Sequence, residues 1–344
     1  MVQVAERMGV AYRREMDRKA EVVGVGHAIV DVLAPATDDL VTSLGLAKGT
    51  MALVDDERSA HIFEALGSTT ASSGGSAANT CAGLASLGAA VAFIGKVRDD
   101  DLGRAFGHDI RRAGVDFDVD PATGGAGTGR CVVLVTPDAE RTMCTSLGIG
   151  DHLGPDDIDE DLIRRSRVLY LEGYLCGLDA TDATIDRALE AASAGHTEVA
   201  LSLSDPYWVA THGGALERVL GQSQIVFANE AEASGLTGAT DVEAAVAALA
   251  ERCATVVVTR GAAGSIVAEA GRVTHIPAEA VRQVVDTTGA GDLFAAGYLF
   301  GHARGLDPRR SARLGARCAA EVIAHFGARP EVSLAALADD GTYR

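Results

Sequence analysis

Short apolar runs alternate with alanine-rich stretches along most of this chain, and no other feature of the sequence constrains the fold as strongly. The runs are rich in β-branched residues, as buried strands are, whereas the alanine-rich stretches have helical periodicity. We predict strands at Val22–Val25, Val91–Ile94, Val168–Leu171, Val199–Leu203, Ile225–Phe227 and Val256–Thr259. We predict helices over residues 76–88, 101–113, 179–195, 241–252, 292–304 and 308–326. This alternation predicts an α/β fold of three layers, with helices on both faces of a mostly parallel central sheet.

Two segments interrupt the alternation. Residues Val32–Val54 and Phe117–Thr145 contain alternating apolar residues and Gly, Pro and Asp turn residues, with no helix signal. We interpret them as additional strands that pair into a small β-sheet and project from the main domain as a lid. The expected organisation is an N-terminal extension (1–21), one α/β domain (22–330) with lid strands inserted at about 32–56 and 117–145, and a C-terminal tail (331–344).

The composition excludes several classes of protein. A formal net charge of -18 argues against binding to nucleic acids or to anionic membranes. The three lysines, Lys19, Lys48 and Lys96, lie outside any G-x-x-x-x-G-K-[ST] sequence, so a P-loop is excluded. The 6 cysteines form no C-x-x-C pair and no apolar stretch reaches about 18 residues, so we expect a cytoplasmic protein with reduced thiols and no membrane span.

One turn near the C-terminus carries the strongest chemical signal. The run Asp286-Thr287-Thr288-Gly289-Ala290-Gly291-Asp292 connects an expected strand end at Val284–Val285 to an apolar helix that we expect to begin at Asp292. Such a turn points several backbone N–H groups at one spot, and the helix N-terminus adds positive partial charge, so the spot suits a phosphate. A carboxylate there can take a proton from an attacking hydroxyl. The alternative is a glycine-rich turn with Asp292 as helix N-cap.

Two further motifs precede it. The run Gly24–Asp31 is similar to a dinucleotide fingerprint, but its third glycine is missing and no helix follows, so we reject a dinucleotide site. The run Ser73–Thr80 opens a predicted helix with paired glycines, which let the backbone approach a ligand closely. Asn79 lies about one turn inside this helix, where Asn is a weak helix former, and a ligand contact would explain it. The alternative is a plain helix start with Ser76 as N-cap.

Taken together, these motifs resemble one known family. D-T-T-G-A-G-D at 286–292, G-G-x-x-x-N at 74–79, N-x-x-E at 229–232 and V-T-x-G-x-x-G at 258–264 are similar to the signatures of the ribokinase-like (PfkB) carbohydrate and nucleoside kinases. The resemblance covers nearly the whole chain after residue 21. It implies that Asp292 is the catalytic base and that the amides of Gly289, Ala290 and Gly291 form an anion hole. For Asp286 it implies a structural role or a share in holding a monovalent cation such as K⁺.

The resemblance also implies where substrates bind. Asp31 would bind sugar hydroxyls together with Gly75, Ser76 and Asn79, and His27 stands where nucleoside kinases of this type usually carry Asn. ATP is the implied phosphoryl donor, and Glu232 would order the water shell of its Mg²⁺. Arg141 would reach from the lid to a phosphate or to the substrate. The implied nucleotide-binding residues are Asn229, Thr259, Arg260, Gly261 and Gly264.

Within the family, the middle of the chain is most similar to the bacterial adenosine kinases, in the stretches 141–145, 171–175, 204–207 and 227–230. Tyr174 and Tyr207 fall where those enzymes place aromatic residues against the purine. The implied reaction is transfer of a phosphoryl group from ATP to the 5′-hydroxyl of adenosine, giving AMP for purine salvage. A sugar kinase of the same family and a non-catalytic nucleotide-binding protein remain alternatives. We expect small-molecule partners and a monomer or homodimer.

Overall fold

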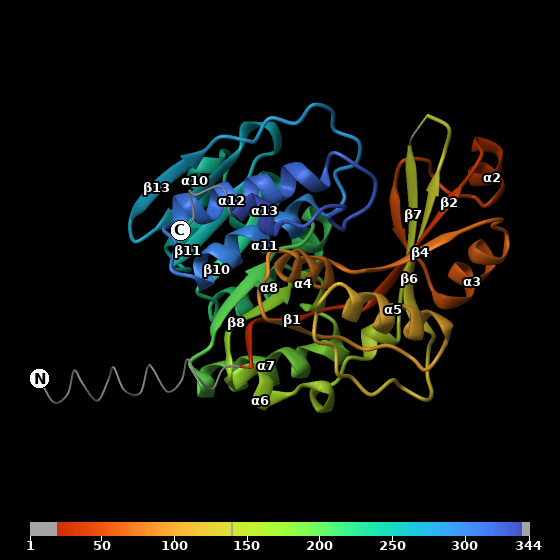
Figure 1. Ribbon diagram of the computed structural model, residues 1–344, viewed down its shortest axis with the longest axis horizontal. Coiled ribbons are helices and arrows are strands. Elements are labelled where there is room, and N and C mark those ends of the chain that lie inside the picture. Colours follow the sequence, from red (N-terminus) through yellow and green to blue (C-terminus); the bar gives the residue numbers. More distant parts are fainter. Residues whose placement is uncertain (1–18, 139, 339–344) are drawn as a thin grey trace, which may run out of the picture.

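The computed structural model describes residues 19–138 and 140–338, so nearly all of the expected N-terminal extension lies outside the described residues. Two β-sheets make up the framework, a large one in the body of the molecule and a smaller one at its side (Figure 1). Among the described residues, no helix has both the length and the apolar character needed to cross a membrane. All six cysteines lie in the described part, and each is a free, buried thiol.

The large sheet has eight strands in the order β13-β12-β11-β10-β9-β8-β1-β5. Six of them run parallel, and these contain the six strands predicted from the sequence. The parallel strands are β1 (Ala20–Val25), β5 (Val91–Ile94), β8 (Ser166–Glu172), β9 (Glu198–Ser202), β10 (Ile225–Asn229) and β11 (Thr255–Thr259). An antiparallel hairpin, β12 (Ser265–Glu269) and β13 (Arg272–Ile276), completes one edge. The predicted α/β fold with a mostly parallel sheet is confirmed.

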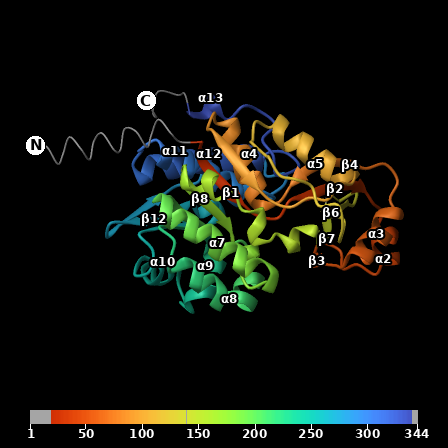
Figure 2. The same cartoon turned by 90° about the horizontal axis from the view of Figure 1, so that it is seen from below.

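Helices cover both faces of this sheet (Figure 2). One face carries α4 (Ser76–Ser86), α5 (Asp101–Arg112), α11 (Ala290–Ala303) and α12 (Pro308–Val322). The other carries α7 (Asp179–Gly195), α8 (Pro206–Leu220), α9 (Glu230–Thr237) and α10 (Val242–Ala250), while α6 (Glu160–Arg164) and α13 (Ala335–Ala338) are short. Because side chains alternate along a strand, Val22 packs in the first layer of core and Val23 in the second.

The smaller sheet has the strand order β3-β7-β6-β2-β4. Its strands are β2 (Ile29–Pro35), β3 (Met51–Leu53), β4 (Thr70–Gly74), β6 (Thr128–Val135) and β7 (Arg141–Gly148). Two helices, α2 (Asp38–Ser43) and α3 (Asp56–Glu64), belong to the same region, and Val41 and Ile62 pack with Val132 and Leu134 in a separate small core. This sheet stands beside the carboxyl ends of the central strands (Figure 1).

Several sequence expectations need correction. Helix α2 lies inside the segment 32–54, in which we expected strands alone; Thr37 caps it by accepting from the N–H of Leu40. Strand β4 lies outside both expected lid segments, because its sequence T-A-S-S-G lacks apolar alternation. Helices α8 and α9 were not predicted, although Asp205 and Pro206 form a standard helix start for α8. Residues 117–127 contain an isolated bridge and no strand.

The strand expected to end at Val284–Val285 is also absent from the structure. Instead, the backbone N–H of Val285 donates to the carbonyl of Ile323, at the end of α12, over 2.8 Å. Val284 is 56% exposed, so this pair of β-branched residues does not enter the sheet. The helix that follows begins at Ala290, two residues before the expected start, with Gly289 in the left-handed region at φ 78°.

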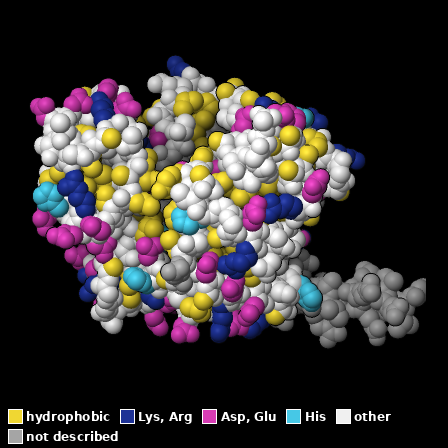
Figure 3. All heavy atoms as spheres, turned by 180° about the vertical axis from the view of Figure 1, so that it is seen from behind, with side chains coloured by type: hydrophobic (Ala, Val, Ile, Leu, Met, Phe, Trp, Pro, Cys, Tyr) yellow, Lys and Arg dark blue, Asp and Glu magenta, His cyan; other side chains and the backbone are white. Residues whose placement is uncertain are grey.

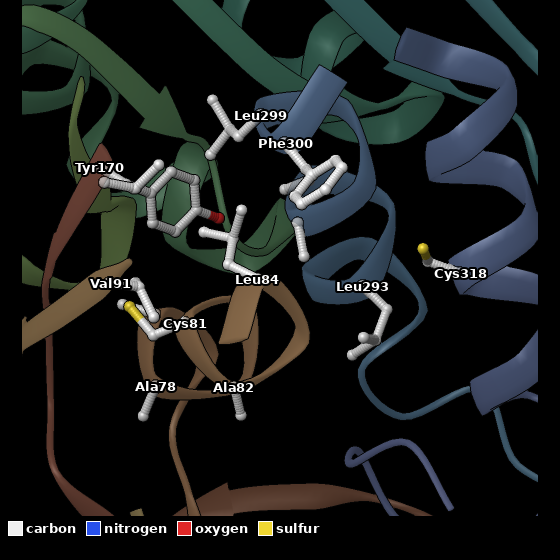
Figure 4. Packing of buried hydrophobic residues seen from close by; sticks show 14 of the residues in the cluster. Ala78, Cys81, Ala82, Leu84, Val91, Tyr170, Leu293, Leu299, Phe300 and Cys318 are labelled. Atoms are coloured by element: carbon white, nitrogen blue, oxygen red, sulfur yellow. The ribbon is translucent and has the colours of Figure 1, made fainter. Parts of the chain in front are cut away.

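Helix α11 lies beside α4 in the core (Figure 4), and small residues bring it against both α4 and α12. A Cβ on Gly83 of α4 would lie 2.8 Å from the Cβ of Ala296 of α11. A Cβ on Gly297 would lie 2.7 Å from the backbone of Gly315 in α12. The backbones of α11 and α12 are therefore in direct contact, and side chains of α11 lie directly on the backbone of α4, so the position of α11 depends on glycines at both contacts.

This contact predicts an opposite outcome for two Gly→Ala changes in helices. Gly297→Ala should lower the free energy of unfolding by about 2 kcal/mol, because its Cβ meets backbone atoms that have no room to move. Gly214→Ala in α8, where a Cβ would meet nothing within 4 Å, should raise it by about 0.5–1 kcal/mol through helix propensity. Urea-induced unfolding measures both. Equal stability of the two variants would contradict the close packing of α11 on α12.

Candidate active site

A cavity of about 1050 Å³ opens where the carboxyl ends of the central strands face the smaller sheet. In parallel α/β sheets, ligand sites lie at this edge. Figure 3 shows hydrophobic side chains along the furrow between the smaller sheet and the body. Most residues singled out from the sequence line this cavity, namely His27, Asp31, Gly75, Ser76, Asn79, Tyr174, Tyr207, Asn229, Glu232, Thr259, Gly289, Ala290, Gly291 and Asp292.

Asp292 lies in the first turn of α11, with its carboxylate toward α4. Its Oδ1 accepts a hydrogen bond from Ser76 Oγ at 2.7 Å, and its Oδ2 accepts one from Asn79 Nδ2 at 3.0 Å. Burial raises the pKa of Asp292 to about 6, although these two hydrogen bonds oppose the rise. A carboxylate with this pKa is ionised at neutral pH and is a better proton acceptor than an exposed aspartate.

The turn before Asp292 leaves room for an anion. Gly289 has a positive φ of 78°, and a Cβ there would lie 2.7 Å from the Cβ of Ala328, so glycine is required. A Cβ on Gly291 would meet nothing within 4 Å, so this residue faces open space in the cavity. The first amides of α11 have no carbonyl partners within the helix and carry positive partial charge. The turn thus offers room and positive partial charge for the predicted anion hole, but the amide of Ala290 is engaged, because it donates to the carbonyl of Thr287 at 3.2 Å.

Asp31 lies on β2 of the smaller sheet, at the cavity wall. Its carboxylate packs directly on Gly74, where a Cβ would lie 2.3 Å from Asp31 Oδ2. Burial raises the pKa of Asp31 to about 6, and the charges of Asp292 and Asp286 add to the rise. An ionised carboxylate accepts hydrogen bonds at both oxygens, so Asp31 suits a ligand with two neighbouring hydroxyls.

His27 lies between two carboxylates of the protein. Its imidazole is 1% exposed, and Glu172 Oε1 accepts hydrogen bonds from both the backbone N–H and Nδ1 of His27, each at 2.7 Å. Asp151 Oδ1 lies 3.5 Å from Nε2. Burial lowers the pKa of His27, but Asp151 and Glu172 more than offset this and raise it to about 9. Both ring nitrogens thus face protein carboxylates, although the residue borders the cavity.

Glu172, at the end of β8, connects three elements. From the sequence it was identified only as part of the stretch 171–175 that resembles the adenosine kinases. Besides accepting from His27, its carboxylate accepts from the backbone N–H of Ala77 at 2.9 Å, in the first turn of α4. It is 1% exposed. A buried carboxylate needs several hydrogen-bond donors to be stable. A charged residue at the end of an apolar strand was therefore the sequence signal that could have indicated a role for Glu172.

Glu232 and Asn229 form a reciprocal cap at the start of α9. The backbone N–H of Asn229 donates to Glu232 Oε2 at 2.9 Å, and the N–H of Glu232 donates to Asn229 Oδ1 at 2.9 Å. Burial raises the pKa of Glu232 to about 7. No group of three or more His, Cys, Asp or Glu in the described residues is arranged to hold a metal. One carboxylate at the wall fits Mg²⁺, which keeps most of its waters.

Arg141 joins the smaller sheet to the turn before α11. Its Nη1 lies 2.6 Å from Asp286 Oδ2, and its guanidinium stacks over the ring of Phe326 at 5.1 Å. Asp286 Oδ2 also accepts from the N–H of Gly327, and Oδ1 accepts from the N–H and hydroxyl of Thr288. Since both oxygens are engaged by donors, and one donor is cationic, these residues do not fit a monovalent cation. Neither Arg141 nor Asp286 lines the cavity.

The nucleotide segment is placed at the turn between β11 and β12. Thr259 reaches the cavity, whereas Arg260, Gly261 and Gly264 do not line it. Gly264 has a φ of 85° and closes the turn of the antiparallel hairpin, where a Cβ would lie 2.0 Å from the carbonyl of Ile276. Arg260 faces Glu230, with Nε at 3.5 Å. The V-T-x-G-x-x-G motif thus has a complete structural explanation as a hairpin turn.

The smaller sheet contributes an apolar wall that sequence reasoning missed. Met51 and Leu53 on β3 are 43% and 49% exposed, and with Met143 on β7 they line the cavity. On the opposite side, Tyr174 packs edge to face with Trp208 at 5.7 Å, and Tyr207 is 67% exposed at the cavity rim. In the sequence, the two apolar residues Met51 and Leu53 stand two positions apart, as on one face of a strand, and this spacing was the signal that could have indicated the apolar wall. A flat apolar ligand group would be enclosed between these sides.

Comparisons with known proteins identify the family of this chain. A model of the pfkB family of carbohydrate kinases matches residues 38–334. An uncharacterized sugar kinase of Archaeoglobus fulgidus is 33% identical over 251 residues, which are 72% of this chain and 96% of that protein. The adenosine kinase of Saccharomyces cerevisiae is 29% identical over 330 residues, 90% of this chain and 96% of its own. The crystal structure of adenosine kinase from Sinorhizobium meliloti matches with a TM-score of 0.86 and 41% sequence identity. The match covers 93% of this chain and 98% of that chain.

These similarities extend over most of each chain, so they concern the whole fold and not a single motif. Kinases of this family transfer a phosphoryl group from ATP to a hydroxyl group, typically with Mg²⁺. The named relatives act on nucleosides and on sugars. This chain therefore belongs to the PfkB family of carbohydrate kinases and is a phosphotransferase that acts on a hydroxyl group of a nucleoside or a sugar.

Proposed function

We propose that the chain is an adenosine kinase, which phosphorylates the 5′-hydroxyl of adenosine with ATP to give AMP and ADP. One observation carries this proposal: a single cavity holds Asp31, Asp292 and an apolar wall. Its volume of about 1050 Å³ is at the upper end of the range of about 300–1,000 Å³ found for drug-sized ligands. It therefore has room for both an acceptor and the reacting end of a nucleotide.

In the proposed reaction, Asp292 accepts the proton of the 5′-hydroxyl. The freed oxygen forms a bond to the γ-phosphorus of ATP while the bond to the β-phosphate oxygen breaks, so ADP leaves with the bonding electrons. The amides of Gly289–Gly291 hold the transferred group through hydrogen bonds that strengthen as charge develops. Mg²⁺, when bound with ATP, neutralises phosphate charge, and Glu232 would hold it through water. Arg141 does not line the cavity and its Nη1 pairs with Asp286, so only its buried Nη2, which has no hydrogen-bond partner, remains for a contact with a phosphate.

The sugar would bind between Asp31 and α4. Asp31 accepts from the two vicinal hydroxyls of a ribose, which an ionised carboxylate accommodates at once. Asn79 Oδ1 is buried and has no hydrogen-bond partner, so it is available to a substrate hydroxyl. Gly75, with a φ of 96°, brings the backbone close to the same place. These contacts orient the 5′-hydroxyl toward Asp292, whose carboxylate Asn79 also contacts.

The base would lie against the apolar side chains of the smaller sheet. Met51, Leu53 and Met143 offer exposed apolar surface, and Tyr174 with Trp208 offers aromatic edges on the facing side. We propose that the smaller sheet acts as a lid, because ligand binding would bury this surface and expel water from the site. Asn229 and Thr259 line the cavity and would contact the phosphates of ATP, whereas the Arg260–Gly264 turn lies outside the cavity lining.

A sugar kinase of the same family is the second candidate, and His27 favours it. Glu172 holds Nδ1 of the imidazole, and Nε2, which has no hydrogen-bond partner, lies 3.5 Å from Asp151 Oδ1, so the ring is oriented by protein carboxylates and does not supply the amide that Asn provides in nucleoside kinases. One named relative is a sugar kinase. A free sugar would fill the Asp31 end of the cavity and leave the apolar wall uncovered, which costs hydrophobic free energy. This cost favours the nucleoside.

A substrate panel tests the proposal. Purified protein with MgATP should release ADP with adenosine much faster than with inosine, guanosine, ribose or fructose, and AMP should be the product. Leu53→Ser removes part of the apolar wall and should raise the KM for adenosine while leaving any activity on ribose unchanged. A preference for ribose or fructose, unaffected by Leu53→Ser, would establish the sugar kinase instead.

Replacing the proposed base should stop turnover without unfolding the protein. Asp292→Asn should lower kcat by about 10²-fold or more, because the amide cannot accept the hydroxyl proton, while its shape is kept. ADP release at saturating adenosine and ATP measures this effect. The matched control is Asp120→Asn, at an exposed position outside the cavity, which should behave as wild type. Near-wild-type kcat in a folded Asp292→Asn protein would remove Asp292 from the mechanism.

The rate should depend on pH as the two cavity carboxylates dictate. Asp292 and Asp31 both have a pKa of about 6, raised by burial, and both act in the ionised form. We expect kcat/KM to be constant above about pH 8, where Glu232 with its pKa of about 7 is ionised as well, and to fall below pH 6, by about tenfold per pH unit where one group titrates and more steeply where both Asp292 and Asp31 do. Return of samples from pH 5 to pH 7.5 controls for unfolding. A flat profile between pH 5 and 8 would contradict this assignment.

A further inference from the structure

Arg329, from the segment that follows α12, binds Ser73 and Ala78. These two residues lie at the two ends of the segment that contains most of the G-G-x-x-x-N motif. Its Nε donates to the carbonyl of Ser73 at 3.2 Å and its Nη2 to Ser73 Oγ at 3.0 Å. Its Nη1 donates to the carbonyl of Ala78 at 3.0 Å. All three nitrogens of the guanidinium are thus used, and the planar group fixes the distance between two points five residues apart.

The residues between and beside these points contact the two carboxylates of the proposed reaction. Gly74, next to Ser73, supports the carboxylate of Asp31, because even a Cβ at this position would overlap it. Asn79, next to Ala78, donates to Asp292 Oδ2 at 3.0 Å. A shift of the loop held by Arg329 would therefore displace the immediate neighbours of both carboxylates.

Asp109 of α5 fixes the far side of the same loop. Its Oδ2 accepts from the backbone N–H of Ser73 at 2.8 Å and from Ser73 Oγ at 2.6 Å. Because this hydroxyl donates to Asp109, its lone pairs are directed to Arg329, and the order Asp109, Ser73, Arg329 has a single consistent direction of hydrogen bonds. This series of hydrogen bonds, which begins at Asp109 on a helix outside the cavity, holds the guanidinium of Arg329 in place.

The charge of Arg329 acts on carboxylates that it does not contact. Burial raises the pKa of Asp31 and of Asp292, and the charge of Arg329 opposes the rise in both cases. The other cations near the site are engaged: Arg141 pairs with Asp286, and His27 pairs with Glu172. Several groups near Asp292 carry negative charge or can ionise. They are Glu172 and the Tyr170 phenol of β8, Asp31 of β2, Tyr174, and Glu232 of α9.

We propose that Arg329 is a positioning residue for phosphoryl transfer: it fixes the segment that contacts Asp31 and Asp292, and its permanent charge favours the ionised forms of both. The inference rests on the proposed role of Asp292 as base. Arg329 itself touches neither substrate nor phosphate in this scheme, since its nitrogens are used by Ser73 and Ala78. Guanidinium keeps its charge at every pH at which the enzyme works.

The test compares pH profiles of kcat/KM for adenosine phosphorylation in wild type, Arg329→Gln and Arg329→Lys. Arg329→Gln removes the charge, so the fall in rate on the acid side should move to higher pH. A shift of one pH unit makes the variant roughly eightfold slower than wild type at pH 5.5, beyond its constant loss, if one carboxylate titrates, and about 60-fold slower if both do; this additional loss should disappear at pH 8.5. Arg329→Lys keeps the charge but loses the fork, so its acid limb should stay in place while kcat falls at all pH values.

A purely structural role gives a different result. In that case Arg329→Gln would lose the same factor at every pH, with an acid limb at the wild-type position, and the proposal would be overturned. If Arg329→Gln proves unfolded by circular dichroism, Arg329→Lys decides: an acid limb that moves, or a kcat equal to wild type, contradicts the proposal. The Asp292→Asn variant separates the two failures: full activity in this variant would refute the base on which the inference rests, whereas an inactive Asp292→Asn together with an unmoved acid limb in Arg329→Gln would refute the role of Arg329 alone.

Discussion

The close approach of α11 to α4 is the contact on which the site depends. Because Gly83 offers no side chain, Leu293 and Ala296 of α11 reach the backbone of α4, and the two helices meet almost without intervening atoms. This contact places the first turn of α11 beside the first turn of α4, so Ser76 and Asn79 reach the carboxylate of Asp292. A base, its two hydrogen-bond donors and a helix N-terminus thus come together through packing of the core.

The second constraint is the concentration of negative charge in the cavity. Asp31, Glu172, Glu232 and Asp292 all line it, in a protein with a net charge of -18. Three of them are stabilised by fixed donors: His27 and Ala77 for Glu172, Asn229 for Glu232, and α4 for Asp292. ATP, which is itself anionic, is accommodated because backbone amides and a few engaged cations provide positive charge at defined points.

Much of the fold could be predicted, because buried parallel strands are continuous β-branched runs whose pattern does not depend on their partners. The missed elements had weak local patterns: Thr70–Gly74 forms β4 only because β2 lies beside it, and Val284–Val285 has β-branched residues but no partner strand. Most candidate site residues were found since they lie within short motifs. Met51 and Leu53 were not assigned to the site, because their importance comes from contacts with residues far away in the chain.

By itself, the sequence determined the α/β architecture, the turn Gly289–Gly291 and the presence of a carboxylate at the start of α11, because periodicity and glycine spacing act over a few residues. The tertiary structure decided what surrounds each group. It enclosed His27 between Glu172 and Asp151, paired Arg141 with Asp286, and brought the wall of Met51 and Leu53 across from Tyr174. Burial, charge and hydrogen bonding depend on neighbours in space, and only the folded chain brings those neighbours together.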